Sequence, residues 1–143
     1  MFEEHRTLDE VRWLYERVYD LPVVVMSNWV LLQVCDFVGG VIFPRELARK
    51  VLGHLNESLI PVIEHPHRKR WTILVYPNCL PDDVAERAMS RSCVSMTVRG
   101  DRVVLPLPCD RGGFRWIREP AKPVVLPKLS EIIAAMQAVQ TWV

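Results

Sequence analysis

The sequence lacks the short motifs that would identify a function directly. It has no Walker loop, no G-x-G-x-x-G or G-x-S-x-G turn and no H-E-x-x-H motif. Their absence removes the common signatures of nucleotide hydrolases, dinucleotide-dependent enzymes, serine hydrolases and zinc proteases. No apolar run approaches the roughly 18–20 residues that a membrane span needs, and the polar start MFEEHRTLDE does not resemble a secretion signal. We therefore expect a cytoplasmic protein that does not cross a membrane.

The four cysteines are also too scattered to suggest a metal centre. Cys35, Cys79, Cys93 and Cys109 form no C-x-x-C pair, so the spacing of a structural zinc site is missing. In a cytoplasmic protein we interpret them as reduced thiols that pack as small hydrophobic side chains. We expect no cofactor.

Length and composition favour one folded domain. The chain has 143 residues, half of them hydrophobic, which is enough for a single core. The net charge is only +1, but residues 61–118 carry ten basic and six acidic side chains, whereas residues 1–60 carry six and nine. The middle of the chain is thus mildly basic, less so than a dedicated DNA-binding domain.

The hydrophobic pattern predicts an α+β domain over residues 1–143, with a mainly antiparallel or mixed sheet and helices packed on it. Helices are expected at 7–20, 44–55, 81–90 and 128–142, and strands at 23–26, 29–35, 41–43, 61–65, 70–76, 93–98, 102–107 and 114–117. Thr7 and Glu10 predict a capping box for the first helix.

Three further expectations concern the strands. The apolar density of 29–35 predicts a strand buried on both faces. Gly39 and Gly40 are expected to interrupt the sheet before 41–43. Strands 93–98 and 102–107 flank Arg99-Gly100-Asp101 and predict a hairpin.

The stretch EHPHRKRW, residues 64–71, is the first candidate site. Its cations Arg68, Lys69 and Arg70 suit a phosphate contact, and the same pattern also fits a solvated turn between two strands. His65 and His67 are weak candidates for metal ligands, because no third ligand is evident and Pro66 favours a bend between them.

A second candidate combines aromatic and basic side chains. Arg99 and Arg102 flank the predicted turn at 99–101, and DRGGFRWIR follows at 110–118. Period-two alternation places Phe114, Trp116 and Arg118 on one face of a strand and Arg115 on the other. Such surfaces bind single-stranded nucleic acid through phosphate pairing and base stacking. The alternative is an edge strand whose aromatic side chains belong to the core.

The middle and end of the chain resemble a known family. The stretches PVIEHPHRKRWTILVYP, CVSMTVRGDRVVLPLP, GGFRWIREP and VVLPKLSEII are similar in order and local pattern to the N-terminal domain of actinobacterial bifunctional DNA primase/polymerases. The resemblance covers about residues 29–135. It implies a primase/polymerase-like core that either keeps a groove for nucleotide or nucleic acid or has turned that surface to a protein partner. His65 or His67 would stand where the family histidine contacts nucleotide.

The chain departs from this family where catalysis would occur. The family pattern has two acids two residues apart on a strand, then a histidine and a further acid, because two divalent cations must be held. The corresponding stretch here, VCDFVGGVIFP, contains only Asp36. The resemblance therefore implies a truncated relative without the acidic catalytic motif.

Three functional hypotheses follow. The first is a non-catalytic module that binds nucleic acid or a nucleotide through Arg68, Lys69, Arg70, Arg99, Arg102 and Arg115, with Trp71 or Trp116 as a stacking platform. The second is a regulatory protein-interaction module, homodimers included, that uses the apolar C-terminal helix ending AVQTWV. The third is an enzyme with an unrecognised site, such as Cys35 or Cys93 assisted by His65 or His67.

Overall fold

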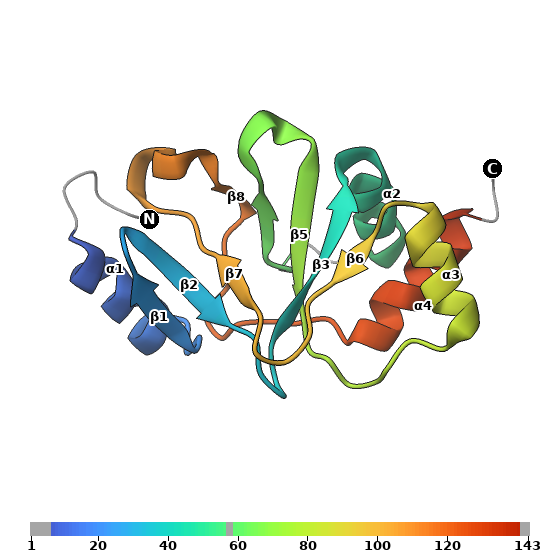
Figure 1. Ribbon diagram of the computed structural model, residues 1–143, viewed down its shortest axis with the longest axis horizontal. Helices are drawn as coiled ribbons and strands as arrows, with labels where there is room; N and C mark the ends of the chain where they lie inside the picture. The colour runs from blue at the N-terminus through green and yellow to red at the C-terminus, as the bar shows by residue number, and fades with distance from the viewer. Residues whose placement is uncertain (1–6, 57–58, 141–143) are drawn as a thin grey trace.

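Two antiparallel sheets organise the computed structural model, which describes residues 7–56 and 59–140 (Figure 1). The large sheet has the order β6-β3-β5-β4-β8 and the small sheet the order β1-β2-β7. The large sheet comprises β3 (Gly39–Pro44), β4 (Val62–Glu64), β5 (Arg70–Val75), β6 (Ser95–Met96) and β8 (Arg115–Arg118), and the small sheet β1 (Val23–Met26), β2 (Trp29–Gln33) and β7 (Arg102–Val104). The fold class is α+β, as the sequence predicts.

Four α-helices accompany the sheets, and no described helix crosses the front of the strands in Figure 1. They are α1 (Leu8–Trp13), which continues as the π-helical turn η1 (Leu14–Val18), α2 (Arg45–Leu55), α3 (Asp83–Arg91) and α4 (Leu129–Gln140). The capping box is confirmed: Thr7 Oγ1 accepts from the Glu10 backbone N–H at 3.2 Å, and the Thr7 N–H donates to the Glu10 carboxylate.

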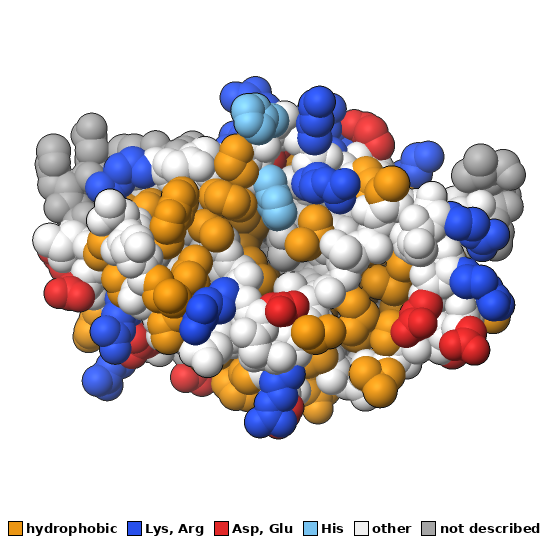
Figure 2. All heavy atoms as spheres, viewed as in Figure 1, with side chains coloured by type: hydrophobic (Ala, Val, Ile, Leu, Met, Phe, Trp, Pro, Cys, Tyr) orange, Lys and Arg blue, Asp and Glu red, His pale blue; other side chains and the backbone are white. Residues whose placement is uncertain are grey.

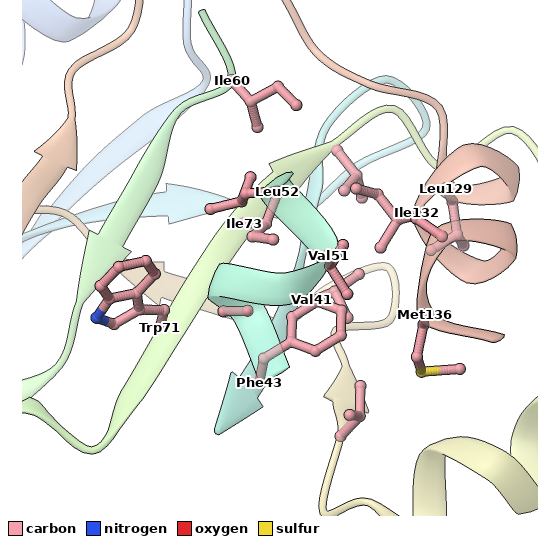
Figure 3. Close-up of a cluster of buried hydrophobic side chains, with 14 of the residues drawn as sticks. Val41, Phe43, Val51, Leu52, Ile60, Trp71, Ile73, Leu129, Ile132 and Met136 are labelled. Atoms are coloured by element: carbon pink, nitrogen blue, oxygen red, sulfur yellow. The ribbon is translucent and has the colours of Figure 1, made fainter. Parts of the chain in front are cut away.

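Strand β5 forms the centre of the molecule, because its residues 71–75 are all buried. One face of β5 is covered by α2 and α4, and we call it the back face. Side chains on this face pack with β3, α2 and α4 in the first hydrophobic cluster (Figure 3). Phe43, Ile73, Val51, Ile132 and Met136 are each at most 1% exposed in this cluster. The apolar face of α4 therefore completes the domain's own core.

The small sheet covers part of the front face of the large sheet. Ile63 and Leu74 from the large sheet pack with Val30 and Leu32 of the small sheet in a second hydrophobic cluster. Tyr15 anchors η1 to this cluster: its hydroxyl donates to the Pro106 carbonyl at 2.6 Å and accepts from the Trp116 indole N–H at 3.0 Å. Burial raises the pKa of Tyr15 strongly, so this hydroxyl keeps its proton.

Three strand expectations need correction. Strand β2 alternates between buried and more exposed residues, because only its inner face is covered. Gly39 and Gly40 lie inside β3, where the close approach of Thr72 leaves no room for a side chain at residue 40. Residues 93–107 do not form a hairpin, because β6 pairs with β3 and β7 pairs with β2. The turn at Gly100 (φ 95°) instead carries the chain from one sheet to the other.

The four helices overlap their predicted ranges, but β6 is limited to Ser95–Met96 and β7 ends at Val104, and residues 108–113 form an unpredicted 3₁₀ segment, η3. The proline-rich segment at 119–127 contains no strand, and an isolated parallel bridge joins Lys128, which follows it, to Tyr76, which follows β5. Among the described residues, no helix is long and apolar enough to span a membrane.

A pair of glycine substitutions tests the packing at the centre of the large sheet. A Cβ at residue 40 would lie 2.9 Å from Thr72 Cγ2, whereas one at Gly53 on α2 would meet nothing within 4 Å. We expect Gly40→Ala to lower the free energy of unfolding by about 1–3 kcal/mol. Gly53→Ala should leave it unchanged or raise it by up to about 1 kcal/mol, because alanine favours helix. Urea denaturation of both variants checks this, and equal effects would contradict the packing.

Candidate nucleic-acid interface

The turn between β4 and β5 presents three consecutive cations. It contains the 3₁₀ segment η2 (Pro66–Arg68), and His67, Arg68, Lys69 and Arg70 are exposed. Arg68 and Lys69 form no hydrogen bond or ion pair with a described side chain, and Arg70 donates to the Cys93 carbonyl at 3.2 Å. Figure 2 shows basic and histidine side chains gathered over this hairpin.

The turn is held in a strained conformation. His67 (φ 71°) and Arg68 (φ 60°) both adopt left-handed backbone angles, which cost non-glycine residues about 1–2 kcal/mol each. Two backbone hydrogen bonds close the turn, His65 N–H to the Arg70 carbonyl and Arg68 N–H to the His65 carbonyl. The Arg45 N–H donates to the Lys69 carbonyl and fixes the turn to the start of α2. The cations are thus presented by a braced backbone.

His65 faces the front of the large sheet. Its Nε2 lies 2.6 Å from Oγ1 of the buried Thr72, and its ring centroid lies 5.3 Å from that of Phe114. Burial, together with the nearby Arg70, lowers the pKa of His65. The imidazole is therefore neutral at neutral pH and is engaged with Thr72.

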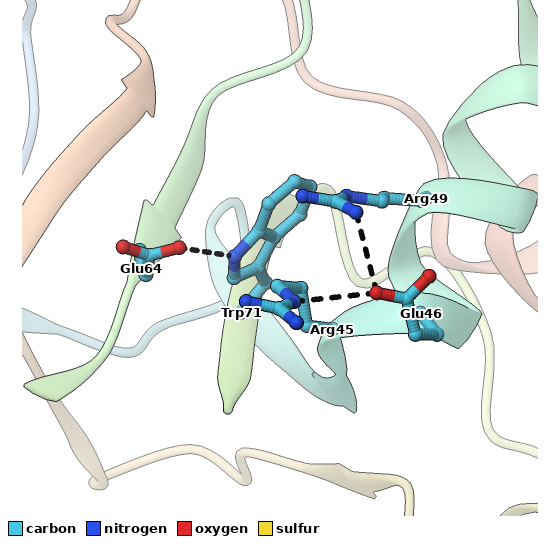
Figure 4. A network of polar contacts seen from close by, with 5 residues as sticks. All are labelled: Arg45, Glu46, Arg49, Glu64 and Trp71. Carbon is cyan, nitrogen blue, oxygen red and sulfur yellow. Dashed lines mark hydrogen bonds and ion pairs between the residues drawn. The ribbon is translucent and has the colours of Figure 1, made fainter. Parts of the chain in front are cut away.

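Trp71 lies on the opposite face and is only 6% exposed. Its indole N–H donates to Glu64 Oε2 at 2.9 Å, and the Arg49 guanidinium lies over the ring at 5.5 Å (Figure 4). A base cannot stack on a ring covered in this way, so the expectation of Trp71 as a stacking platform is wrong.

Arg115 also belongs to this back network. Its Nε donates to Glu64 Oε1 at 2.8 Å, and the Glu64 side chain is 4% exposed. Burial alone would raise the pKa of Glu64, but hydrogen bonds from Arg115 and Trp71 outweigh burial and lower that pKa. Arg115 compensates a buried carboxylate and does not join the basic turn on the front face.

Trp116 and Phe114 point between the two sheets, on the opposite side of β8 from Arg115. Both pack against the second hydrophobic cluster, and the Trp116 indole bonds to Tyr15. The alternation of Phe114, Arg115 and Trp116 is therefore as predicted, but a β-bulge interrupts it before Arg118, which pairs with Val62. The aromatic side chains serve the core. Trp116 is accordingly not an open stacking surface.

Arg99 and Arg102 have different surroundings. Arg99 sits at the turn between β6 and β7 and pairs with Asp36 at 3.2 Å. Arg102 lies on β7 opposite Gln33, on the outer face of the small sheet, and is exposed. Of the eight predicted residues, Arg68, Lys69, Arg70 and Arg102 remain available to a ligand on the front of the molecule.

Trp29 is an aromatic residue of the front face that sequence reasoning did not select. Its half-buried ring meets Phe114 edge-on, with centroids 6.1 Å apart and an interplanar angle of 87°. A Cβ on Gly112 would lie 2.3 Å from this ring, so glycine there lets the chain pass over Trp29. In the sequence, the only sign of this contact is the glycine at position 112, which the structure holds in a left-handed conformation (φ 79°).

No metal or nucleophile centre forms in the part of the chain that the structure describes. No three His, Cys, Asp or Glu side chains within residues 7–56 and 59–140 come together as a metal site. Cys35, Cys79 and Cys93 are free thiols, and within the same residues no hydrogen bond joins Cys35 or Cys93 to a histidine. Asp36 is 75% exposed and lies in the loop before β3.

No family model, curated protein or solved structure matches this chain.

The Glu64 network generates a pH-dependent prediction. Glu64→Gln removes the charge that Arg115 and Trp71 bond to, and should lower the free energy of unfolding by about 1–3 kcal/mol at neutral pH. The Glu64 pKa is lowered on folding, so this stabilisation is complete at neutral pH and is lost as the carboxylate protonates. The difference between wild type and variant should shrink below about pH 4.

Urea denaturation at several pH values measures this difference. Glu46→Gln is the matched control, because Glu46 pairs with Arg45 and Arg49 but its side chain is 68% exposed. Its effect should stay within about 0.5 kcal/mol. A Glu64→Gln effect that does not change with pH would contradict the assignment of charge to Glu64.

Proposed function

We propose that this protein binds single-stranded nucleic acid across the exposed surface formed by the basic turn at 65–70, Trp29 and the outer face of the small sheet, which no described helix covers in Figure 1. The observation that carries the proposal is the braced turn at 65–70, which presents three consecutive cations on that surface. The resemblance to the primase/polymerase family supports the same choice of ligand. The proposal assigns this surface a binding role and no catalytic step.

The charges of the turn suit phosphate. Arg68 and Lys69 form no ion pair with a described side chain, although the charge of Arg68 helps to lower the pKa of Glu64. Arg70 donates only to a carbonyl, so no ion pair has to be broken before a phosphate binds. The strained backbone orders the turn in advance, which reduces the entropy lost on binding. Arg102 adds a separate exposed cation at the start of β7, beside Gln33. Contacts of this kind position a strand without reading its sequence.

Trp29 is the aromatic residue best placed to meet a base on this face. It begins β2, at the end of this strand opposite to the Gln33–Arg102 pair, and its ring is held by Phe114 and Gly112. Hydrophobic side chains over the small sheet adjoin the basic hairpin in Figure 2. An aromatic ring next to cations favours single strands, whose bases are free to stack.

The alternatives have less structural support. The apolar face of α4, on which the protein-interaction hypothesis depended, is buried against α2 and the sheet, and Trp142 and Val143 lie outside the described residues. The enzyme hypothesis has no assembled cysteine–histidine pair among those residues.

A triple substitution tests the phosphate contacts. Arg68→Gln/Lys69→Gln/Arg70→Gln should weaken binding of a fluorescent oligothymidylate at least about tenfold at low salt. The slope of log K against log salt should fall by about two, because each phosphate contact on a single strand contributes about 0.7. Fluorescence anisotropy at several salt concentrations measures both values.

The control for this variant removes three other exposed cations. Lys50→Gln/Arg87→Gln/Arg91→Gln lowers the net charge equally but acts on α2 and α3. It should retain most of the affinity and slope. Equal loss in both triple variants would mean that net charge alone drives binding, and absence of binding by wild type would end the proposal.

A substitution of Trp29 tests the stacking contact separately. Trp29→Leu keeps an apolar side chain and removes the ring, so single-strand affinity should fall by about 1–3 kcal/mol. The salt slope should not change, since no phosphate contact is lost. Anisotropy with the same oligonucleotide checks this, and circular dichroism confirms that the variant folds. Unchanged affinity in a folded Trp29→Leu variant would exclude Trp29 from stacking.

A further inference from the structure

A separate cavity lies at the other end of β3 and β5 from the basic turn. Its volume is about 280 Å³, and its walls come from the loop before β3, the segment after β5 and the turn between β6 and β7. Val34, Val75, Met96 and Leu129 contribute apolar side chains to its lining, and Cys35 and Cys79 contribute thiols. Apolar cavities with a few convergent polar groups are the usual form of a small-molecule site.

The rim of the cavity exposes apolar side chains to solvent. Leu80 is 87% exposed and Val98 is 59% exposed, and both line this cavity and an adjoining groove beside α3. Covering them with an apolar ligand would remove hydrocarbon surface from water, which is favourable. The exposed rim therefore fits an apolar occupant.

Two charged residues line the cavity, Asp36 and Arg99. They pair with each other through Arg99 Nη1 and Asp36 Oδ1 at 3.2 Å, and their side chains are 77% and 75% exposed. Such exposed pairs contribute little to stability, so Arg99 can leave Asp36 at small cost while Asp36 remains hydrated. The guanidinium then has its whole donor fork available at the mouth of the cavity.

We propose that this cavity binds a small carboxylate with an apolar chain, which lies among Val34, Val75 and Leu129 while Arg99 holds the carboxylate. A planar donor fork binds carboxylate through two parallel hydrogen bonds, which favours an acid over an alcohol. Liquid water occupies about 30 Å³ per molecule, so the cavity accommodates roughly nine non-hydrogen atoms. Octanoate has ten non-hydrogen atoms, so its chain fits the cavity when its carboxylate lies at the mouth beside Arg99.

This site lies at the opposite end of the β3–β5 ladder from the basic turn on which the nucleic-acid proposal rests. Pro44 pairs with Arg70 at one end of the β3–β5 ladder, and Gly39 pairs with Val75 at the other. Arg99, which the sequence grouped with the nucleic-acid residues, belongs here to a different surface. Failure of either proposal leaves the other intact.

The thiols of the cavity give a direct test. Octanoate, below its micelle concentration, should slow alkylation of Cys35 and Cys79 by iodoacetamide, measured for each cysteine peptide by mass spectrometry. Cys93 is exposed and does not line the cavity, so its rate should stay constant and serves as the internal control. Octanol and octylamine should protect at least about tenfold less than octanoate at equal concentration.

Two variants complete the test. Arg99→Gln should weaken octanoate protection at least about tenfold, whereas Arg87→Gln, an exposed substitution on α3, should leave it unchanged. Protection that survives Arg99→Gln overturns the proposal, as does equal protection by octylamine or octanol. Octanoate that protects neither Cys35 nor Cys79 overturns it as well.

Discussion

Burial of β5 on both faces is the constraint on which the rest of the structure depends. Ile73 and Leu74 point in opposite directions and are both fully buried, so each face of the strand needs its own cover. The helices α2 and α4 supply it at the back, and the small sheet supplies it in front. The chain must therefore divide 93–104 between two sheets, which is why the turn at Gly100 joins β6 to β7 without pairing them.

The same constraint determines to which face each polar side chain of the β4–β5 hairpin points. Glu64 and Trp71 point to the back, where Arg115 neutralises the carboxylate under α2. His65 points to the front and bonds to Thr72. Only the turn beyond the buried part of β5 is free of packing, and there Arg68, Lys69 and Arg70 are exposed together. The charged surface is thus a consequence of where burial ends.

Sequence periodicity was sufficient for most elements, and insufficient for the pairing between them. The capping box at Thr7, the helix after Pro44 and the alternation of Phe114, Arg115 and Trp116 follow local rules and were predicted. The choice of Trp71 was wrong because local spacing does not reveal that α2 covers that face. Trp29 was missed for the converse reason, since its neighbours Phe114 and Gly112 are distant in the sequence. Pairing of β6 and β7 depends likewise on long-range burial.

Amide and indole chemical shifts during titration with oligothymidylate at low salt would test the account most directly. We expect the shifts to concentrate on residues 65–70, on Arg102 and its strand neighbours, and on the Trp29 indole, and to diminish as salt is added. Shifts confined to the helical face of α2 and α4, or no shifts at low salt, would contradict the assignment of the front face to nucleic acid.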